Sequence, residues 1–415
     1  MYELAIIGAG AAGIACAKYA LKAGLKTILI EESPQNFGGV CLNKGCIPTK
    51  FFINKVQTTK HWLELKNQAQ NLIDQIKKPL LDFFEKNKIQ VQWGKALFLD
   101  AHTLKVDSKK IEAKNIIIAG GSLPKRLGIA NYKKIITADQ FFEQDELPYN
   151  IAIIGGGYIG IEFATFLNLL GKKVTVIEKE QNILPTFDTN LSERLQNILE
   201  KKGITFLTDI DINKINLESF DIVIEAIGRY ANIAELNLKN AGVDINCNGQ
   251  IETNEFLQTT QKNIYCCGDI TAKKMLAYTA EHQAYVCIHN ILGKNIKEDY
   301  EGIAECVFSI PQIAKVGLQE KDLTSDSKTK YKLIKSNFLR FSSTYVYDDK
   351  ESFIQIIVDD NQMIKGASVI SKFSSDLISL FSLIIRKKIK ISDLKNCFFV
   401  HPTIQEIIPS LFREL

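Results

Sequence analysis

The chain has no long hydrophobic run. No stretch of about 18 uncharged apolar residues occurs in its 415 residues, although a helix needs about that many to cross a membrane. The first residues, MYELAIIGAG, contain no basic region and no cleavage site of small residues, so they do not resemble a secretory signal. We therefore expect a cytoplasmic protein that does not bind a membrane.

The chain has no large excess of charge of one sign, and it contains few cysteines. The 51 basic and 47 acidic residues leave a net charge of +4, which is too balanced to indicate nucleic acid or an anionic membrane as a partner. Nine cysteines are an odd and sparse number for this length, and they do not indicate a secreted disulfide scaffold. In a reducing cytoplasm we expect any disulfide to be catalytic rather than structural.

The rest of the composition is typical of a globular protein. Hydrophobic residues make up 46% and charged residues 24%, close to the average, which excludes disorder, collagen-like repeats and coiled coil for most of the chain. The length corresponds to about two to four domains, at roughly 100–200 residues each.

One pattern occurs twice. Residues 3–10, ELAIIGAG, and residues 150–157, NIAIIGGG, each run from a short apolar strand into glycines with G-x-G-x-x-G spacing. A helix and a second apolar strand follow, and that strand ends in Glu31 or Glu178, 23 residues after the first glycine in both copies. The glycines are Gly8, Gly10 and Gly13 in the first copy and Gly155, Gly157 and Gly160 in the second.

This pattern is typical of dinucleotide binding. The first glycine permits a tight turn, the second lets the backbone approach a pyrophosphate, and the third packs helix on strand. The glutamate can accept a hydrogen bond from a ribose hydroxyl. The alternative is a glycine-rich turn in another kind of α/β protein, and two copies with equal spacing argue against it. We predict a flavin and a nicotinamide; because Glu178 would repel a 2′-phosphate, NAD is favoured over NADP.

Two cysteines lie in the glycine-rich segment GGVCLNKGCIPTK, residues 38–50. No Cys/His cluster nearby would complete a zinc site with Cys41 and Cys46, so we expect no metal. Pro48 fits the start of a helix, which would place Cys46 near a helix N-terminus, where the pKa of a thiol falls. The alternative is a pair of buried structural cysteines.

For two other segments we expect a structural role only. Residues 56–88 have apolar residues at every third or fourth position, which predicts a helix that Pro79 should break or kink. The adjacent Cys266 and Cys267 lie in an apolar strand, and we expect core thiols there rather than ligands of a soft metal.

Together, the segments GAGAAG, GGVCLNKGCIPTK and GGGYIGIE resemble the class I pyridine nucleotide–disulfide oxidoreductases. IIIAGGSLP (116–124) is similar to the family's ATG segment, with Gly120 where threonine is usual, and IYCCGDI (264–270) is similar to its second FAD motif. Residues 305–318 resemble the start of the interface domain, and HPTIQE (401–406) resembles the active-site motif. The resemblance spans nearly the whole chain.

The resemblance implies an α/β fold with two Rossmann-like dinucleotide-binding domains, one for FAD and one for NAD, followed by a C-terminal α+β dimerisation domain. Because the second glycine pattern begins near Asn150 and the GD motif returns to the flavin, we expect the FAD domain to be discontinuous, at 1–147 and 264–299. The NAD domain would be 148–263 and the dimerisation domain 300–415.

The resemblance also implies the catalytic roles. Cys46 would face the flavin as the charge-transfer thiolate, and Cys41 would be the interchange thiol that reacts with the substrate sulfur. His401 would be the base, with Glu406 at its other ring nitrogen. His401 would act across a two-fold interface, so we expect a homodimer.

Further residues match the family's cofactor contacts. Asp269 would bond the ribityl chain, Lys50 and Glu162 would form an ion pair near the reactive part of the flavin, and Tyr158 would lie over the flavin on the nicotinamide side. The expected FAD contacts are Gly8, Gly10, Gly13, Glu31, Gly39, Lys50, Gly120 and Asp269. The expected NAD contacts are Gly155, Gly157, Tyr158, Gly160, Glu162, Glu178 and Gly228.

Three branches of the family, which differ in substrate, are candidates for this chain. Dihydrolipoamide dehydrogenases use NAD, glutathione reductases use NADP, and mercuric reductases carry a C-terminal cysteine pair that is absent from PSLFREL. Glu178 and His401 favour the first branch, although Tyr278 and Phe399 replace its usual histidines and the chain is short. We expect oxidation of free or protein-bound dihydrolipoamide, with the acyltransferase core of a 2-oxoacid dehydrogenase complex as a candidate partner. A flavoprotein scaffold is the non-enzymatic alternative.

Overall fold

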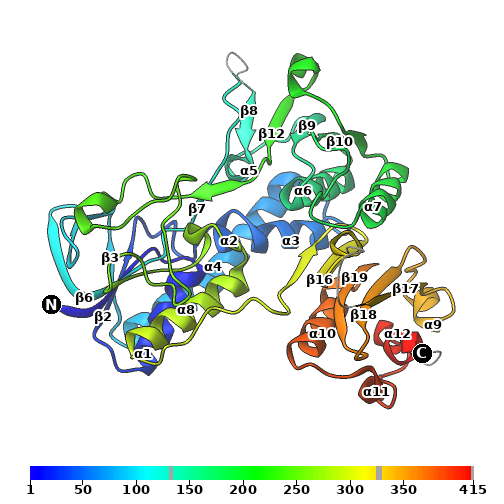
Figure 1. Ribbon diagram of the computed structural model, residues 1–415. Coiled ribbons are helices and arrows are strands. Elements are labelled where there is room, and N and C mark those ends of the chain that lie inside the picture. The colour runs from blue at the N-terminus through cyan, green and yellow to red at the C-terminus, as the bar shows by residue number, and fades with distance from the viewer. Residues whose placement is uncertain (130–133, 324–329, 413–415) are drawn as a thin grey trace. The chain divides into compact units, whose positions relative to one another are not determined.

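The computed structural model describes residues 1–129, 134–323 and 330–412. The chain divides into two compact units, coloured along the chain in Figure 1. The first unit contains residues 1–127, 137–146 and 228–299, and the second contains residues 128–136, 147–227 and 300–415. No helix within the described ranges is long and apolar enough to cross a membrane.

A seven-stranded sheet forms the centre of the first unit, in the order β3-β2-β1-β6-β5-β4, with β14 paired to β6. Its strands are β1 (Tyr2–Ile7), β2 (Thr27–Glu31), β3 (Gln90–Trp93), β4 (Ala96–Phe98), β5 (Thr103–Val106), β6 (Lys109–Ile118) and β14 (Ile264–Cys266). Strands β3, β2, β1, β6 and β14 run parallel. Because such strands are covered on both faces, β1 and β2 are nearly continuous apolar runs.

Helices α1 (Ala11–Lys22) and α8 (Ala277–Ile291) pack against each other over this sheet (Figure 1). Their facing surfaces are rich in alanine, which lets the helices approach closely. The thiols of Cys16 and Cys267 lie 3.6 Å apart in this core. Cys266 and Cys267 are both fully buried, so the expectation of core thiols is confirmed.

Shorter elements complete the first unit. β7 (Ser122–Pro124) and β13 (Arg229–Ala231) form an antiparallel pair. The other helices of the unit are α2 (Gly39–Asn43), α3 (Cys46–Lys55), α4 (Trp62–Lys86) and α5 (Ala138–Phe141).

The helix predicted for residues 56–88 differs from the structure at its start and at its proline. α3 ends at Lys55, and α4 begins only at Trp62 and then continues through Pro79 to Lys86. Pro79 and Gln75, four residues before it, are both exposed. Pro79 has no N–H group to donate to the Gln75 carbonyl oxygen. Because both residues are exposed, water can bind that oxygen instead, and the helix tolerates the proline.

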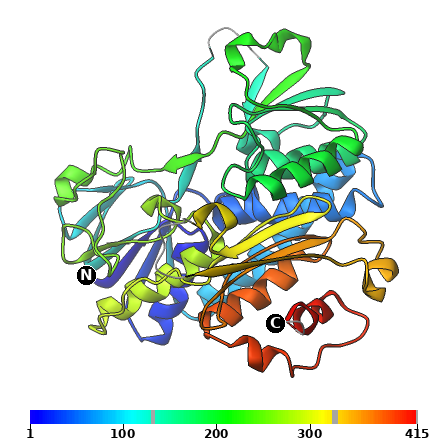
Figure 2. The same ribbon diagram turned by 45° about the vertical axis from the view of Figure 1, so that its right-hand side comes forward.

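The second unit contains two sheets, seen from another direction in Figure 2. The first sheet has the order β11-β10-β9-β12-β8 and carries α6 (Tyr158–Leu169) and α7 (Thr189–Lys201). Strands β9 to β12 of this sheet are parallel. The strands of the whole sheet are β8 (Ile135–Thr137), β9 (Asn150–Ile154), β10 (Lys173–Ile177), β11 (Thr205–Leu207) and β12 (Ile222–Glu225).

The other sheet of this unit is antiparallel, in the order β15-β16-β19-β18-β17. Its strands are β15 (Ala304–Val307), β16 (Gln312–Gly317), β17 (Tyr331–Asn337), β18 (Phe353–Asp359) and β19 (Ile364–Ser371). α10 (Ser374–Arg386) packs its apolar face on β16 and β19. The remaining helices are α9 (Ser342–Val346), α11 (Ile391–Leu394) and α12 (Ile407–Phe412).

The expected domain boundaries differ from the compact units at two places. Residues 228–263, expected in the NAD domain, belong to the first unit, because Leu236, Leu238 and Ile251 share a core with the central sheet. Residues 128–136, expected in the FAD domain, belong to the second unit, where β8 pairs with β12. The chain therefore passes between the units more often than the motifs indicate.

Candidate active site

The first glycine-rich turn joins β1 to α1. Gly8 has a φ of +98°, and a Cβ there would lie 2.4 Å from the Ala119 carbonyl oxygen. A Cβ on Gly13 would lie 1.8 Å from the Gly8 carbonyl oxygen. Gly10 then caps α1, so the helix begins with unpaired N–H groups that suit an anion such as a pyrophosphate.

The second turn repeats this geometry between β9 and α6. Gly155 has a φ of +106°, and a Cβ there would lie 2.5 Å from the Ala226 carbonyl oxygen. A Cβ on Gly160 would lie 1.9 Å from the Gly155 carbonyl oxygen, while one on Gly157 would meet nothing within 4 Å. The two turns are thus the same structure built twice, as the equal spacing predicts.

The two glutamates that we expect to bind ribose hydroxyl groups are hydrogen-bonded to these turns in the same way. Glu31 accepts a hydrogen bond from the Ala9 N–H at 2.6 Å, and Glu178 accepts one from the Gly156 N–H at 2.6 Å. The second oxygen of Glu178 accepts from the Glu180 N–H at 3.0 Å. A carboxylate has about four acceptor positions, so each glutamate can also bind a hydroxyl group. Burial raises the pKa of Glu31.

The segment with the two cysteines packs directly on the first turn. Gly39, with a φ of +67°, would place a Cβ 2.7 Å from the Gly10 Cα atom. Cys41 lies in α2 and Cys46 is the first residue of α3. The structure thereby brings the redox cysteines and the first dinucleotide turn together, and it confirms that Cys46 lies at a helix N-terminus.

The two thiols interact directly. Cys41 is half-buried and Cys46 is exposed, and a hydrogen bond joins their side chains. That bond, together with burial, raises the pKa of Cys41, while Lys50 acts to lower it and Asp269 to raise it. The hydrogen bond to Cys46 and burial therefore both favour the protonated form of Cys41. Lys50 and Asp269 both lie close enough to influence the pair.

Asp269 follows Gly268, whose backbone conformation favours glycine. Gly268 has a φ of +82° and precedes the short 3-10 helix Asp269–Thr271. A Cβ on Gly120 would lie 3.3 Å from the Ile270 side chain, so the residue that replaces the usual threonine is seated against this helix. The Asp269 carboxylate accepts a hydrogen bond from the Ser122 hydroxyl at 2.7 Å.

The predicted base and its partner meet in the second unit. His401 Nδ1 lies 2.8 Å from Glu406 Oε1, and the other oxygen of Glu406 accepts the Thr403 N–H at 2.9 Å. Burial alone would raise the pKa of Glu406, but the hydrogen bonds from His401 and Thr403 bring it below its usual range. An ionised carboxylate only accepts, so His401 donates from Nδ1 and keeps Nε2 available for a proton.

α6 presents two further predicted residues. Glu162 is buried and accepts the Phe308 N–H at 3.0 Å. The hydroxyl group of Tyr158 donates to Glu305, and Lys315 Nζ lies 3.6 Å from the same carboxylate. Glu305 and Lys315 lie in the segment that resembles the start of the interface domain, but that resemblance gives no indication of their position beside Tyr158.

Two expected contacts join residues of different units. Lys50 and Cys41 belong to the first unit, whereas Glu162 and His401 belong to the second. The ion pair of Lys50 with Glu162 and the contact of Cys41 with His401 therefore remain predictions. Gly228, expected to bind NAD, begins the last segment of the first unit with a φ of +100°. Its carbonyl oxygen accepts the Lys125 N–H at 2.9 Å.

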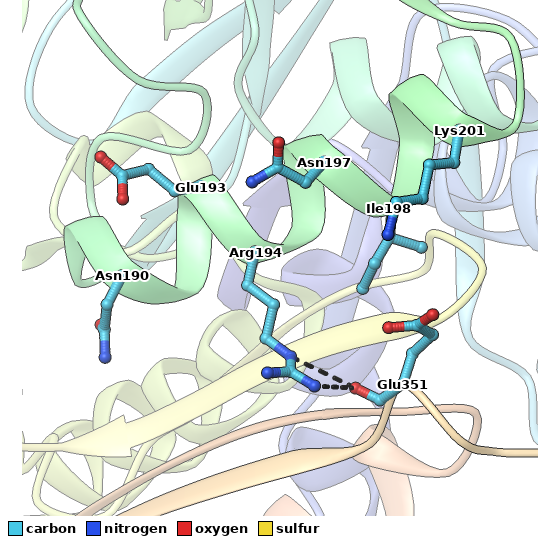
Figure 3. Close-up of a pocket in the computed structure, with 7 residues that line it drawn as sticks. All are labelled: Asn190, Glu193, Arg194, Asn197, Ile198, Lys201 and Glu351. Carbon is cyan, nitrogen blue, oxygen red and sulfur yellow. Dashed lines mark hydrogen bonds between the residues drawn. The ribbon is translucent and has the colours of Figure 1, made fainter.

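A separate surface cavity of about 360 Å³ lies along α7 in the second unit (Figure 3). Arg194 crosses it and donates to the carbonyl oxygen of Glu351 at 3.2 Å. None of its lining residues is an expected site residue; they are Asn190, Glu193, Arg194, Asn197, Ile198, Lys201 and Glu351.

The contact of Gly39 with Gly10 gives a first prediction. Gly39→Ala should weaken FAD binding by about tenfold or more, which corresponds to ~1.4 kcal/mol, because the methyl group would push the cysteine segment off the turn. Gly24→Ala is a matched control, since Gly24 has a φ of +72° but nothing within 4 Å of a Cβ. Both variants carry similar backbone strain, so equal FAD affinities, measured by flavin fluorescence, would contradict the prediction.

Comparison with known proteins shows which family this chain matches. Residues 2–284 match the family described as pyridine nucleotide-disulphide oxidoreductase, and residues 303–411 match its dimerisation domain. The dihydrolipoyl dehydrogenase of Chlamydia pneumoniae is 33% identical over 98% of this chain and 95% of its own length. That of Bacillus subtilis is 30% identical over 98% of this chain and 96% of its own length.

A solved structure is also similar. The HOCl-induced flavoprotein disulfide reductase RclA from Escherichia coli, as its Cu(II) complex, superposes with a TM-score of 0.93 and 26% identity. The match covers 99% of this chain and 98% of that one. The predicted fold class, enzyme class and cofactors, FAD and NAD, are confirmed by these comparisons. The chain belongs to the pyridine nucleotide–disulphide oxidoreductase family.

Proposed function

We propose that this chain is an NAD-dependent dihydrolipoamide dehydrogenase. The observation that carries the proposal is the 2.8 Å contact of His401 with Glu406, because oxidation of a dithiol needs a base and this pair supplies one. Relatives of nearly equal length in Chlamydia pneumoniae and Bacillus subtilis carry the name dihydrolipoyl dehydrogenase. The dimerisation domain supports a homodimer, in which His401 of one subunit would serve the cysteines of the other.

The reaction is a thiol–disulfide exchange. His401 Nε2 removes a proton from one thiol of dihydrolipoamide, and the resulting thiolate attacks Cys41 in the Cys41–Cys46 disulfide, which releases Cys46 as a thiolate. The second substrate thiol then attacks the mixed disulfide, so lipoamide leaves with its own disulfide and Cys41 departs as a thiol. Glu406 stabilises the charged imidazole that forms on His401.

Two cofactors complete the electron path. When bound, FAD supplies the two-electron link between the reduced cysteines and NAD. The chain would hold FAD at the turn Gly8–Gly13 and at Asp269, and it would hold NAD at the turn Gly155–Gly160. We place the FAD-binding domain in the first unit and the NAD-binding and dimerisation domains in the second. An acyltransferase core of a 2-oxoacid dehydrogenase complex is the partner we propose.

A second candidate is an NAD(P)H-dependent disulfide or metal reductase, favoured by the likeness to the Escherichia coli disulfide reductase. One assay separates the two, by offering dihydrolipoamide with NAD, glutathione disulfide with NADPH, and mercuric ion with NADPH. Fastest turnover of dihydrolipoamide is the expected result. Fastest turnover of another substrate would refute the proposal, and no reduction by NADH at all would favour a scaffold.

Cofactor choice gives a second prediction. NAD should exceed NADP in kcat/KM by about tenfold or more, or ~1.4 kcal/mol, because the Glu178 carboxylate accepts a ribose hydroxyl and repels a 2′-phosphate. Glu178→Gln should narrow this preference. Glu180→Gln is a matched control, since that carboxylate is half-exposed and only two residues away. Equal efficiency of the wild type with both cofactors would contradict the assignment.

A further inference from the structure

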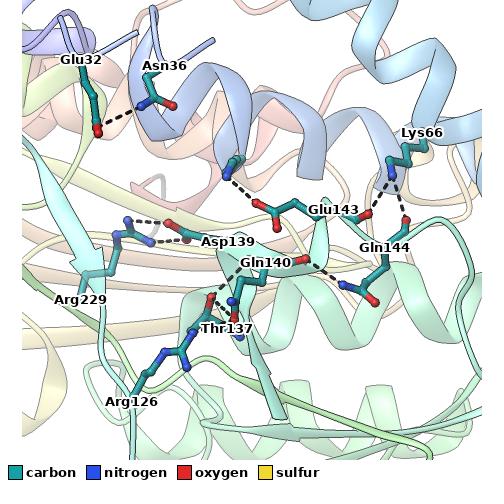
Figure 4. Close-up of polar contacts among 11 residues, drawn as sticks. Glu32, Asn36, Lys66, Arg126, Thr137, Asp139, Gln140, Glu143, Gln144 and Arg229 are labelled. Carbon is teal, nitrogen blue, oxygen red and sulfur yellow. Dashed lines mark hydrogen bonds and ion pairs between the residues drawn. The ribbon is translucent and has the colours of Figure 1, made fainter. Parts of the chain in front are cut away.

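A line of hydrogen bonds leads to Asp269 from three other elements of the first unit. The Ser122 hydroxyl donates to Asp269 Oδ2 at 2.7 Å, and Arg229 Nε donates to the same hydroxyl oxygen at 2.8 Å. Figure 4 shows the guanidinium of Arg229 facing Asp139, with two bonds of 2.6 and 3.1 Å. Asp139, Arg229 and Ser122, which the sequence motifs leave without a role, are called here the Asp269 relay.

The backbone fixes each member of the relay. Ser122 begins β7 and Arg229 begins β13, and these strands are paired. Arg229 Nη2 also donates to the Ser122 carbonyl oxygen at 2.8 Å. Asp139 lies in the first turn of α5, where Thr137 and Gln140 form a capping box.

The chemistry of the groups fixes the direction of the bonds. A guanidinium only donates, an ionised carboxylate only accepts, and a serine hydroxyl has one proton. Because Ser122 already accepts from Arg229, its single proton points to Asp269. One oxygen of Asp269 is thereby committed, and the other can accept a hydroxyl group of a ligand.

Asp139 is the charged partner of Arg229. The side chains of Arg229 and Asp139 are only 11% and 17% exposed, so water competes weakly for their bidentate contact. The Asp139 carboxylate balances the charge of the guanidinium, and its two oxygens accept hydrogen bonds from Nη1 and Nη2 of Arg229. Without that partner, the arginine could pair with Asp269 itself and block the oxygen that a ligand needs.

We propose that Ser122, Arg229 and Asp139 are positioning residues that hold the Asp269 carboxylate correctly oriented for a hydroxyl group of the FAD ribityl chain. This inference rests on the proposed function only in taking Asp269 as an FAD ligand. It adds a role for residues that are distant in sequence and touch the site only through Asp269.

The rate at which purified holoenzyme releases FAD on dilution, followed by flavin fluorescence, tests the relay. Ser122→Ala and Asp139→Asn should each release FAD about tenfold faster or more. Asp139→Asn keeps the shape of the side chain, so it remains informative if the first variant does not fold. Arg126→Gln is the matched control, because Arg126 binds α5 at Gln140, at 2.9 Å, outside the relay; its release rate should stay within about twofold.

A double-mutant cycle separates positioning from general stability. In an Asp269→Ala background, Ser122→Ala should have almost no further effect on FAD release, because the carboxylate to be oriented is gone. An equal acceleration in both backgrounds would overturn the proposal, as would an Asp269→Ala variant that releases FAD at the normal rate. The measurement uses no dithiol, so a protein that fails to oxidise dihydrolipoamide can still show the relay, and the two proposals fail separately.

Discussion

Cys41→Ser should reduce dithiol oxidation to background while NADH still reduces the bound flavin. Cys41 is the half-buried thiol whose pKa is raised by its hydrogen bond to Cys46 and by burial, and in the proposed exchange it forms the mixed disulfide with the substrate. A serine oxygen cannot form that bond. Cys46→Ser should instead remove the long-wavelength charge-transfer absorption, since the sulfur that we propose to face the flavin would be gone.

Steady-state turnover with dihydrolipoamide and stopped-flow reduction by NADH measure these two effects separately. Cys247→Ser is the matched control, because Cys247 is an exposed thiol in the same unit, and it should change neither measurement. If Cys41→Ser lost the absorption band and Cys46→Ser kept it, the two roles would be reversed.

His401→Gln should lower dithiol oxidation by roughly 10²–10⁴-fold, the usual value of a positioned base. Part of the loss should return at high pH, where a dithiol with a pKa near about 8.5 ionises without help. Reduction of an artificial acceptor by NADH bypasses the thiols and should survive. His61→Gln, at an exposed histidine, is the control.

Glu406→Gln should give a milder loss of dithiol oxidation than His401→Gln. Glu406 is ionised at neutral pH, since its hydrogen bonds lower its pKa. Loss of this anion should leave the His401 Nδ1–H without its charged acceptor, so the ring would be held less firmly in the orientation that the reaction needs. The maximum rate of dithiol oxidation should therefore fall. Unchanged dithiol turnover in His401→Gln, or an equal loss of the acceptor reaction, would remove His401 from the mechanism.

The sequence predicts those parts of the site that depend on local backbone geometry. Gly8 and Gly155 need positive φ angles, and Gly13 and Gly160 need close approach to a carbonyl oxygen. Only glycine meets these requirements, so the spacing alone identifies the turns. The contact of His401 with Glu406 is equally local, since five residues separate them.

Contacts between distant residues could not be predicted in this way. Arg229 and Ser122 are 107 residues apart, and neither has a composition signal that names its partner. The place of residues 228–263 in the first unit could not be predicted for the same reason: Leu236 and Ile251 look like any core residues until the sheet they cover is known. α4 passes through Pro79 because that side of the helix is exposed, and exposure is a tertiary property.

The two glycine turns differ in what covers them, and this difference sets how long a ligand stays. Gly10 of the first turn has the Gly39 Cα atom 3.7 Å from its Cβ position, whereas Gly157 of the second turn has nothing within 4 Å. A ligand under the cysteine segment can leave only when that segment moves, so its residence time should span many turnovers. A ligand at the open turn can leave after each turnover. The same turn can thus hold a prosthetic group in one copy and an exchangeable co-substrate in the other.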